Sequence, residues 1–333
     1  MKEILTQHLV QASNNGLAKA MALGVVQDGD VVFEHYINAN PESLFDVASL
    51  TKVISTTTLC AKLVQDGKLD LKAPISEVLK DQAWLGGEAC MLGALLRHQA
   101  GLAAWHDFRH VPADQKSRVL QGLYMIKDPI GQKTRYSDVG FLILGEVLQA
   151  ITQRSYLDLY MSLPKVISKN ILPWHLIPQS SLDKTIATGN SLHRQSIQGK
   201  VFDDNCFYLG GLQPHAGLFA TLDSVMSFLD LWLDDTSFLG ADTKRLFFEG
   251  ASAKDGSRRA LGWDLPSKDS SAGLAVPPGV VGHLGYTGTS IWMDVSRSIG
   301  VVLLTNRTLT RTSQKDFHLF RQQTHDLIWK AMS

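Results

Sequence analysis

The sequence contains few cysteines and no excess of either charge. Three cysteines occur among 333 residues, at Cys60, Cys90 and Cys206, and their isolated, odd-numbered placement gives neither a disulfide framework nor a zinc-binding pattern. We expect them to be small buried hydrophobic side chains in a reducing compartment. The 32 basic residues are balanced by 32 acidic ones, which argues against nucleic acid or an anionic membrane as a partner.

Long hydrophobic runs are also missing. No uninterrupted apolar stretch approaches the length of a transmembrane helix, and the first ten residues lack the basic and apolar regions of an intact signal peptide. We therefore expect a soluble cytoplasmic protein, with an exported mature form as the open alternative. The composition, 44% hydrophobic and 19% charged, is typical of a globular protein with a sizeable core.

Hydrophobic patterning predicts strands near both ends of the chain and helices between them. A hairpin is expected over 21–36 and a second over 291–305, because β-rich runs there flank turn residues. The middle of the chain has the helical period of apolar residues, most strongly over 139–151. We therefore predict an α/β (α+β) fold in which strands from both ends join one antiparallel sheet flanked by helices.

The order of these elements also predicts the domain organisation. We expect a single domain over 1–333. Its sheet-bearing subdomain comprises about 1–48 and 215–333, and an inserted, mainly helical subdomain comprises about 49–214.

A serine and a lysine stand together at the start of a long apolar segment that follows the first hairpin. Ser49 and Lys52 are three residues apart, so on a helix the amine can reach the hydroxyl. A serine hydroxyl needs an adjacent base to attack well. Lysine can be that base only if burial or nearby cations lower its pKa from about 10.4. The alternative is that Ser49 only caps the helix.

The Ser-x-x-Lys spacing alone is a weak pattern, since it occurs three times. In the copy that begins at Ser162, Pro164 prevents a continuous helix. The copy that begins at Ser181 runs into a short, broken segment. Only Ser49 opens a long periodic helix, so it is the predicted nucleophile.

Tyr136 and Asp138 are the predicted proton-transfer partners of the lysine. A phenol can relay a proton and a carboxylate can hold an ammonium. The same short pattern occurs at Tyr36 and Tyr156, but Tyr136 lies on a loop directly before a buried helix, where a rigid scaffold can present it. The alternative is that Asp138 caps that helix and Tyr136 packs in the core.

The third predicted part of the site is His283-Leu-Gly285-Tyr286, just before a strand. Gly285 lets a substrate approach the backbone closely, and the N–H groups of Tyr286 and Ser49 can form an oxyanion hole. For His98 and His215 we expect structural hydrogen bonds.

The three motifs Ser49-Leu-Thr-Lys52, Tyr136-Ser-Asp138 and His283-Leu-Gly285 follow the order found in the serine β-lactamase and penicillin-binding-protein superfamily. The tyrosine of the second motif is similar to the class C β-lactamase branch, which also contains D,D-peptidases and esterases. The resemblance covers most of the chain, including 95–102 and 215–219. It implies a β-lactamase/transpeptidase-like fold, a site between the sheet and the helical subdomain, and acyl-enzyme chemistry without a metal or cofactor.

Three residues depart from the superfamily pattern: Asp138, His283 and Leu284 stand where asparagine, lysine and threonine are usual. The lysine helps to hold a substrate carboxylate, whereas a histidine with a pKa of about 6.5 is mostly neutral at pH 7. We therefore expect weak β-lactamase and carboxypeptidase activity and better turnover of substrates without that carboxylate. The reverse preference would indicate another cation, such as Arg307.

The sequence thus predicts a serine hydrolase that forms an acyl-enzyme on an amide or ester. The expected substrate is a small molecule or peptide, with a peptidoglycan-derived peptide or muropeptide as the favoured case. One alternative is an esterase of small esters. The other is a non-catalytic binding or sensor protein, and the complete set of Ser49, Lys52 and Tyr136 argues against this second alternative. The oligomeric state stays open.

Overall fold

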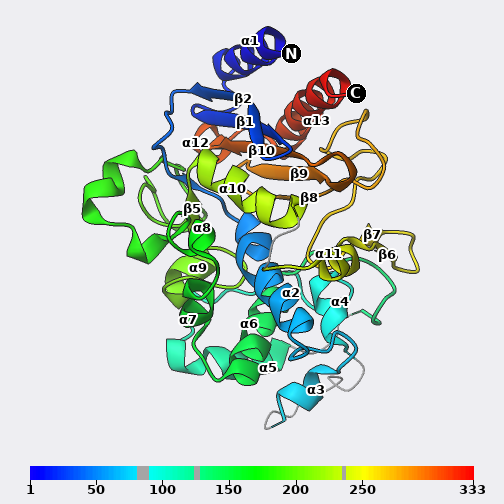
Figure 1. The fold of residues 1–333 in the computed structure, drawn as a ribbon. Coiled ribbons are helices and arrows are strands. Elements are labelled where there is room, and N and C mark those ends of the chain that lie inside the picture. Colours follow the sequence, from blue (N-terminus) through cyan, green and yellow to red (C-terminus); the bar gives the residue numbers. More distant parts are fainter. Residues whose placement is uncertain (81–89, 124–127, 235–237) are drawn as a thin grey trace.

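The computed structural model describes residues 1–80, 90–123, 128–234 and 238–333. Its centre is a five-stranded antiparallel sheet (Figure 1) in the order β2-β1-β10-β9-β8. The strands are β1 (Met21–Gln27), β2 (Asp30–Ile37), β8 (Val281–Leu284), β9 (Ser290–Asp294) and β10 (Ile299–Thr305).

Strands from the two ends of the chain lie side by side in this sheet. β1 pairs with β10 along its whole length, from Met21 opposite Thr305 to Gln27 opposite Ile299. The turn between β1 and β2 has positive φ angles at Asp28 (52°) and Gly29 (83°), as expected for a two-residue hairpin turn. The prediction that both ends of the chain contribute to one sheet is therefore confirmed.

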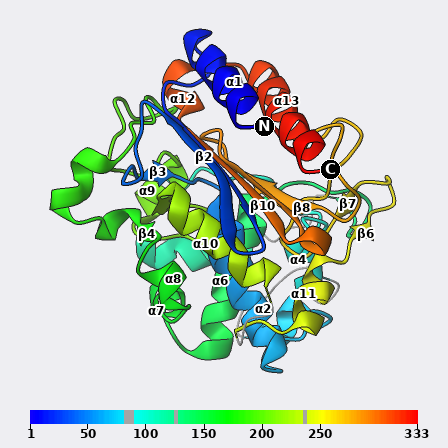
Figure 2. The ribbon, with the colours of Figure 1, turned by 45° about the horizontal axis from the view of Figure 1, so that its top comes forward.

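Helices cover both faces of the sheet. On one face, α1 (Lys2–Asn14) and α13 (Gln314–Ala331) lie next to each other, as Figure 2 shows. They bury a core that includes Leu5, Trp292 and Trp329. On the other face, α10 (Leu222–Leu233) packs against the sheet and begins the larger core that continues into the helical part.

The middle of the chain is mainly helical, as predicted. Its elements, which lie on the α10 side of the sheet in Figure 1, are η1 (Lys52–Thr57), α2 (Thr58–Gln65), α3 (Ile75–Val78), α4 (Leu92–Leu96), α5 (Lys116–Leu123), α6 (Asp138–Thr152), α7 (Tyr156–Met161), α8 (Lys165–Ser168) and α9 (Asp204–Leu209). The sequence also predicts a helix over 117–126, of which residues 124–126 lie outside the described residues. The boundaries of the two subdomains stay a prediction.

Short elements lie between the five-stranded sheet and the helical middle of the chain. A small sheet in the order β3-β5-β4 joins β3 (Phe45–Asp46), β4 (Leu172–Pro173) and β5 (Leu218–Ala220). The chain also contains α11 (Ala241–Phe248), β6 (Ala251–Ser252), β7 (Arg258–Arg259) and α12 (Arg307–Thr310). Four short 3-10 helices complete the described elements: η2 (Ala113–Gln115), η3 (Trp174–Leu176), η4 (Gln179–Lys184) and η5 (Val295–Arg297). None of the helices in the described ranges is long and apolar enough to cross a membrane. The three cysteines are buried and unpaired, as expected.

Candidate active site

Ser49 lies in a tight turn between β3 and the helix that begins beside it. The turn is closed by backbone hydrogen bonds from Thr51 N to Ala48 O (3.0 Å) and from Lys52 N to Ser49 O (3.0 Å). Ala48 has a φ of 48°, a strained value for a residue with a side chain that is typical of functional turns. The following turns, Lys52–Thr57, are the wide turns of a π-helix, which also occur frequently at functional sites.

Lys52 is completely buried and makes three polar contacts. Its Nζ donates to Ser49 Oγ (3.0 Å), to Asp138 Oδ1 (2.7 Å) and to the carbonyl oxygen of His215 (3.4 Å). The structure thus brings the predicted nucleophile, lysine and carboxylate together.

The condition of a lowered Lys52 pKa is not met in the resting protein. Burial alone would lower the pKa of the ammonium, but the Asp138 carboxylate, with Tyr136 in addition, outweighs burial and raises the pKa above its usual value. Lys52 is therefore an ammonium at neutral pH. The physical reason is the departure at Asp138, because the asparagine usual in the superfamily carries no charge.

Asp138 is available to the lysine because another residue caps its helix. The N-cap of α6 is Ser137, whose Oγ accepts a hydrogen bond from Gly140 N (3.0 Å). Asp138 is the first residue inside the helix, and 20% of its side chain is exposed. The alternative reading of Asp138 as the cap is therefore wrong.

Tyr136 stands above the lysine. The Lys52 Nζ lies 4.7 Å from the centre of the Tyr136 ring. The centres of the His98 and Tyr136 rings are 4.5 Å apart. Although 37% of Tyr136 is exposed, burial raises the pKa of its hydroxyl, and the neighbouring Lys52 charge opposes this shift. The phenol is therefore protonated at neutral pH. His98 is structural, as expected, since its Nδ1 accepts from Ser137 N (3.0 Å).

His283 faces the same tyrosine from β8, with 6.0 Å between ring centres. Its Nδ1 makes a 2.9 Å contact with the carbonyl oxygen of Leu284, and this contact requires that nitrogen to carry the proton. Burial, together with the charges of Lys52 and Arg259, places the His283 pKa well below its usual value. His283 is thus a neutral imidazole, and its Nε2 has no hydrogen-bond partner among the described residues. It therefore does not replace the charge of a lysine.

The loop after His283 approaches the Ser49 turn closely. A Cβ on Gly285 would lie 2.7 Å from the carbonyl oxygen of Val47, so only glycine fits. Thr289 Oγ1 donates to the same carbonyl (3.1 Å). Within the described part of the chain, the N–H groups of Ser49 and Tyr286 have no hydrogen-bond partner, which leaves both free to receive an oxyanion.

These residues line one cavity of about 820 Å³. Ser49 and Tyr136 share it with Trp105, Phe202 and Tyr286, and the rings of Phe202 and Tyr286 stack at 5.8 Å between centres. The cavity therefore offers aromatic surfaces beside the polar groups.

Sequence reasoning missed the carboxylates that hold the segment around Phe202 against the Ser49 turn. Asp46 Oδ1 accepts from Ala48 N (2.8 Å) and Oδ2 from Phe202 N (2.6 Å). Burial raises the Asp46 pKa to about 6, although these two bonds oppose the shift. Asp203 caps α9 and contacts His215 Nε2 (3.1 Å), so His215 is structural, as expected.

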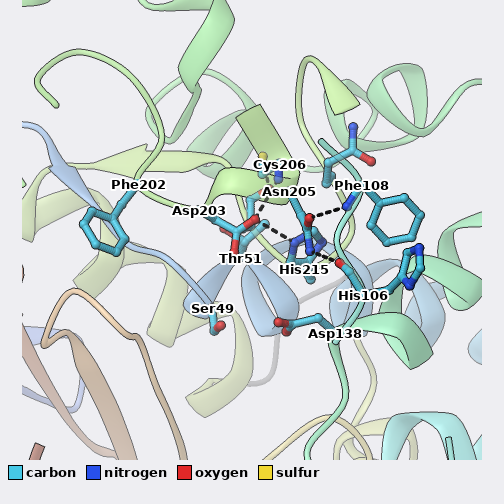
Figure 3. A network of polar contacts seen from close by, with 12 residues as sticks. Ser49, Thr51, His106, Phe108, Asp138, Phe202, Asp203, Asn205, Cys206 and His215 are labelled. Atoms are coloured by element: carbon cyan, nitrogen blue, oxygen red, sulfur yellow. Dashed lines mark hydrogen bonds and ion pairs between the residues drawn. The ribbon is translucent and has the colours of Figure 1, made fainter. Parts of the chain in front are cut away.

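Figure 3 shows how this network is arranged. Asp203 points toward His215, and Ser49 and Asp138 lie below this pair. Asn205 extends the network, since its Nδ2 donates to His106 O (2.7 Å) and its Oδ1 accepts from Phe108 N (3.0 Å). No sequence signal marks these residues, because their partners are far away along the chain.

Arg259 was also missed. Its guanidinium lies 5.9 Å from the Tyr136 ring and pairs with Asp264 (3.4 Å).

In the described residues, no group of three or more histidine, cysteine, aspartate or glutamate side chains is placed to hold a metal ion.

Comparison with known proteins agrees with this geometry. The chain matches the family model "Beta-lactamase" over residues 5–324. It is 27% identical to the N-acetylmuramyl-L-alanine amidase of Bacillus subtilis (strain 168), over 91% of this chain and 77% of the amidase.

Solved structures show the same fold. A class C β-lactamase from Rhodobacter sphaeroides has a TM-score of 0.74 at 18% identity and covers 99% of both chains. A D-alanine carboxypeptidase from Burkholderia cenocepacia has a TM-score of 0.74 at 15% identity and covers 97% of both chains.

The fold is therefore the β-lactamase/transpeptidase fold, and the class of protein is a serine hydrolase. The chain belongs to the Beta-lactamase family.

Proposed function

We propose that this protein hydrolyses an amide bond in a peptidoglycan-derived fragment, through an acyl-enzyme on Ser49. The observation that carries the proposal is the buried Lys52 Nζ, which contacts both Ser49 Oγ and Asp138 Oδ1 below the Tyr136 ring. These contacts support Ser49 as the nucleophile, Lys52 as the base and Tyr136 as the acid of the proposed reaction.

The proton of Ser49 goes to Lys52 in this mechanism. In the resting protein the ammonium donates to Ser49 Oγ, so it must lose a proton before it can act as a base. The fraction of neutral amine rises with pH, and activity should rise with it. The neutral amine then takes the serine proton as Oγ bonds to the carbonyl carbon, and the N–H groups of Ser49 and Tyr286 hold the oxyanion.

Tyr136 supplies the proton that the leaving amine needs. Its raised pKa keeps the phenol protonated, and the Lys52 ammonium formed in the first step can restore that proton. Breakage of the C–N bond leaves the acyl group on Ser49 Oγ. Water then attacks the ester, a reaction in which the same groups act in reverse order.

The proposed substrate rests on the cavity and on one relative. A volume of about 820 Å³ with polar and aromatic walls is large for a minimal ester and suits a sugar–peptide fragment. The Bacillus subtilis relative is named N-acetylmuramyl-L-alanine amidase. We therefore propose a muropeptide as the substrate, cut between the lactyl group of the sugar and the peptide.

An esterase of small esters is the second candidate, because the neutral His283 removes the charge that holds a carboxylate near the scissile bond. A binding or sensor protein would need neither the lysine contact to Ser49 nor free oxyanion donors.

Intact-protein mass spectrometry and product analysis separate these functions. The protein is incubated with a fluorophosphonate, with a penicillin and with N-acetylmuramyl-L-alanyl peptides. The proposal expects a fluorophosphonate adduct on Ser49 and release of free peptide. An adduct with turnover of small esters alone would favour the esterase. Absence of any adduct would favour the binding protein.

A further inference from the structure

Two buried arginines line the cavity, and neither has an acidic partner in the part of the chain that the structure describes. Arg307 follows β10, and Arg321 lies in the middle of α13; both line the cavity. They are only 6% and 8% exposed. In the described ranges, no carboxylate lies within ion-pair distance of either guanidinium.

The other charges of the cavity are already matched. The four aspartates that line the cavity each contact a basic side chain: Asp138 with Lys52, Asp203 with His215, Asp204 with Arg194 and Asp264 with Arg259. No acidic group in the described lining is therefore left over to balance Arg307 and Arg321.

The two guanidiniums differ in how they are held. Arg307 is fixed, since Nη1 donates to Thr312 O (2.9 Å) and Nη2 to Tyr286 O (2.7 Å). Arg321 has no hydrogen bond to any described residue and only stacks near Phe317, 5.1 Å from the ring centre. The Nε of each arginine is buried and unpartnered.

A buried charge without a partner destabilises the folded state. Burial, together with the charge of Arg307, lowers the Arg321 pKa to about 9. An arginine that serves only as core packing would be replaced at no loss by an apolar side chain. Both features instead fit a site completed by an anion from outside the chain.

We propose that Arg307 and Arg321 form a subsite for a carboxylate of the substrate. The subsite deepens the proposed function, because a muropeptide carries carboxylates on its peptide part. Arg307 is tied to Tyr286, the proposed oxyanion donor, so the subsite adjoins the reacting bond. It replaces the charge that the neutral His283 does not supply and reverses the preference for carboxylate-free substrates expected from the sequence.

The substrate experiment compares N-acetylmuramyl-L-alanyl-D-glutamate with the same compound in which both carboxylates are amidated. The native protein should have a kcat/KM about tenfold or more higher for the diacid, the size of effect of a charge-assisted hydrogen bond. Arg321→Gln should remove this preference, chiefly through KM, and Arg321→Lys should retain part of it. Arg245→Gln is the matched control, since Arg245 is 82% exposed and pairs with Asp242. Equal kcat/KM values in the native protein, or an unchanged preference in Arg321→Gln, would overturn the subsite.

A second measurement does not depend on the reaction. Succinate should raise the Tm of the native protein and of Ser49→Ala, relative to chloride at equal ionic strength, because a bound anion stabilises the folded state. Arg321→Gln should show a higher Tm without succinate and no increase with it. If succinate raises the Tm of native protein and Arg321→Gln equally, the subsite is refuted. If the Tm response follows the inference but no amide is cleaved, only the proposed reaction fails.

Discussion

Replacing Asp138 by asparagine should shift the pH dependence of the reaction toward acid. The Asp138 carboxylate lies 2.7 Å from Lys52 Nζ and raises the pKa of the lysine. Asparagine, the usual residue of the superfamily at this position, keeps an oxygen that accepts from the ammonium but has no charge. The neutral form of Lys52 should then become available at lower pH.

The size of the shift follows from the charge pair. Opposite unit charges about 4 Å apart interact by about 4 kcal/mol at an effective dielectric constant of about 20. Because 20% of the Asp138 side chain is exposed, water screens the pair, and we take about half of this value. A loss of about 2 kcal/mol corresponds to about 1.5 pH units. The acid limb of the kcat/KM profile should therefore move down by about 1.5 pH units in Asp138→Asn.

The assay is the rate of fluorophosphonate labelling from pH 6 to about pH 10, which reports the activated serine without a known substrate. The second measurement is the rate of hydrolysis of the preferred substrate over the same pH range. Asp264→Asn is the control, because it removes a carboxylate from the same cavity that pairs with Arg259 and not with Lys52. Its limb should move much less. A limb that stays in place or moves toward alkali in Asp138→Asn would refute Lys52 as the base.

Three further predictions concern the other residues of the site. Ser49→Ala should lose covalent labelling and turnover with unchanged circular dichroism, and labelling of any other serine would remove Ser49 from the mechanism. Lys52→Arg should be nearly inactive, because a guanidinium does not give up its proton in this pH range; a near-native rate at any pH from 6 to 10 would contradict the proposed base. His283→Lys combined with Leu284→Thr should increase acylation by a penicillin about tenfold, as measured by mass spectrometry, and an unchanged rate would show that this corner does not limit β-lactam recognition.

The sheet and the core of the site could be predicted because their signals are local. Two β-rich runs that flank a turn at Asp28 and Gly29 predict the first hairpin, which the structure contains. The spacing of Ser49 and Lys52 is short enough that helix geometry alone brings the hydroxyl and amine together. Tyr136 and Asp138 were singled out because they lie at the start of an apolar helix.

The charge state of the site could not be predicted in the same way. Burial alone would lower the Lys52 pKa, but the sign of the shift depends on a carboxylate that is distant in sequence. The burial of Arg321 could not be predicted from the sequence, because an arginine within an amphipathic helix is usually exposed to solvent. Only the packing of α13 against the sheet shows that its guanidinium is buried at the cavity.

The pairing of β1 with β10 has a consequence for how the chain folds. The two strands are far apart in the sequence, so the central sheet cannot close until β10 has been synthesised, after the whole helical part. Until then, the edge of β1 that pairs with β10 is unpaired while the helical part of the chain is synthesised. Such distant pairing slows folding and leaves an unpaired strand that can join another chain. Folding yield should therefore be most sensitive to substitutions along β10, because it is the last of the five strands to be synthesised and it joins β1 to β9.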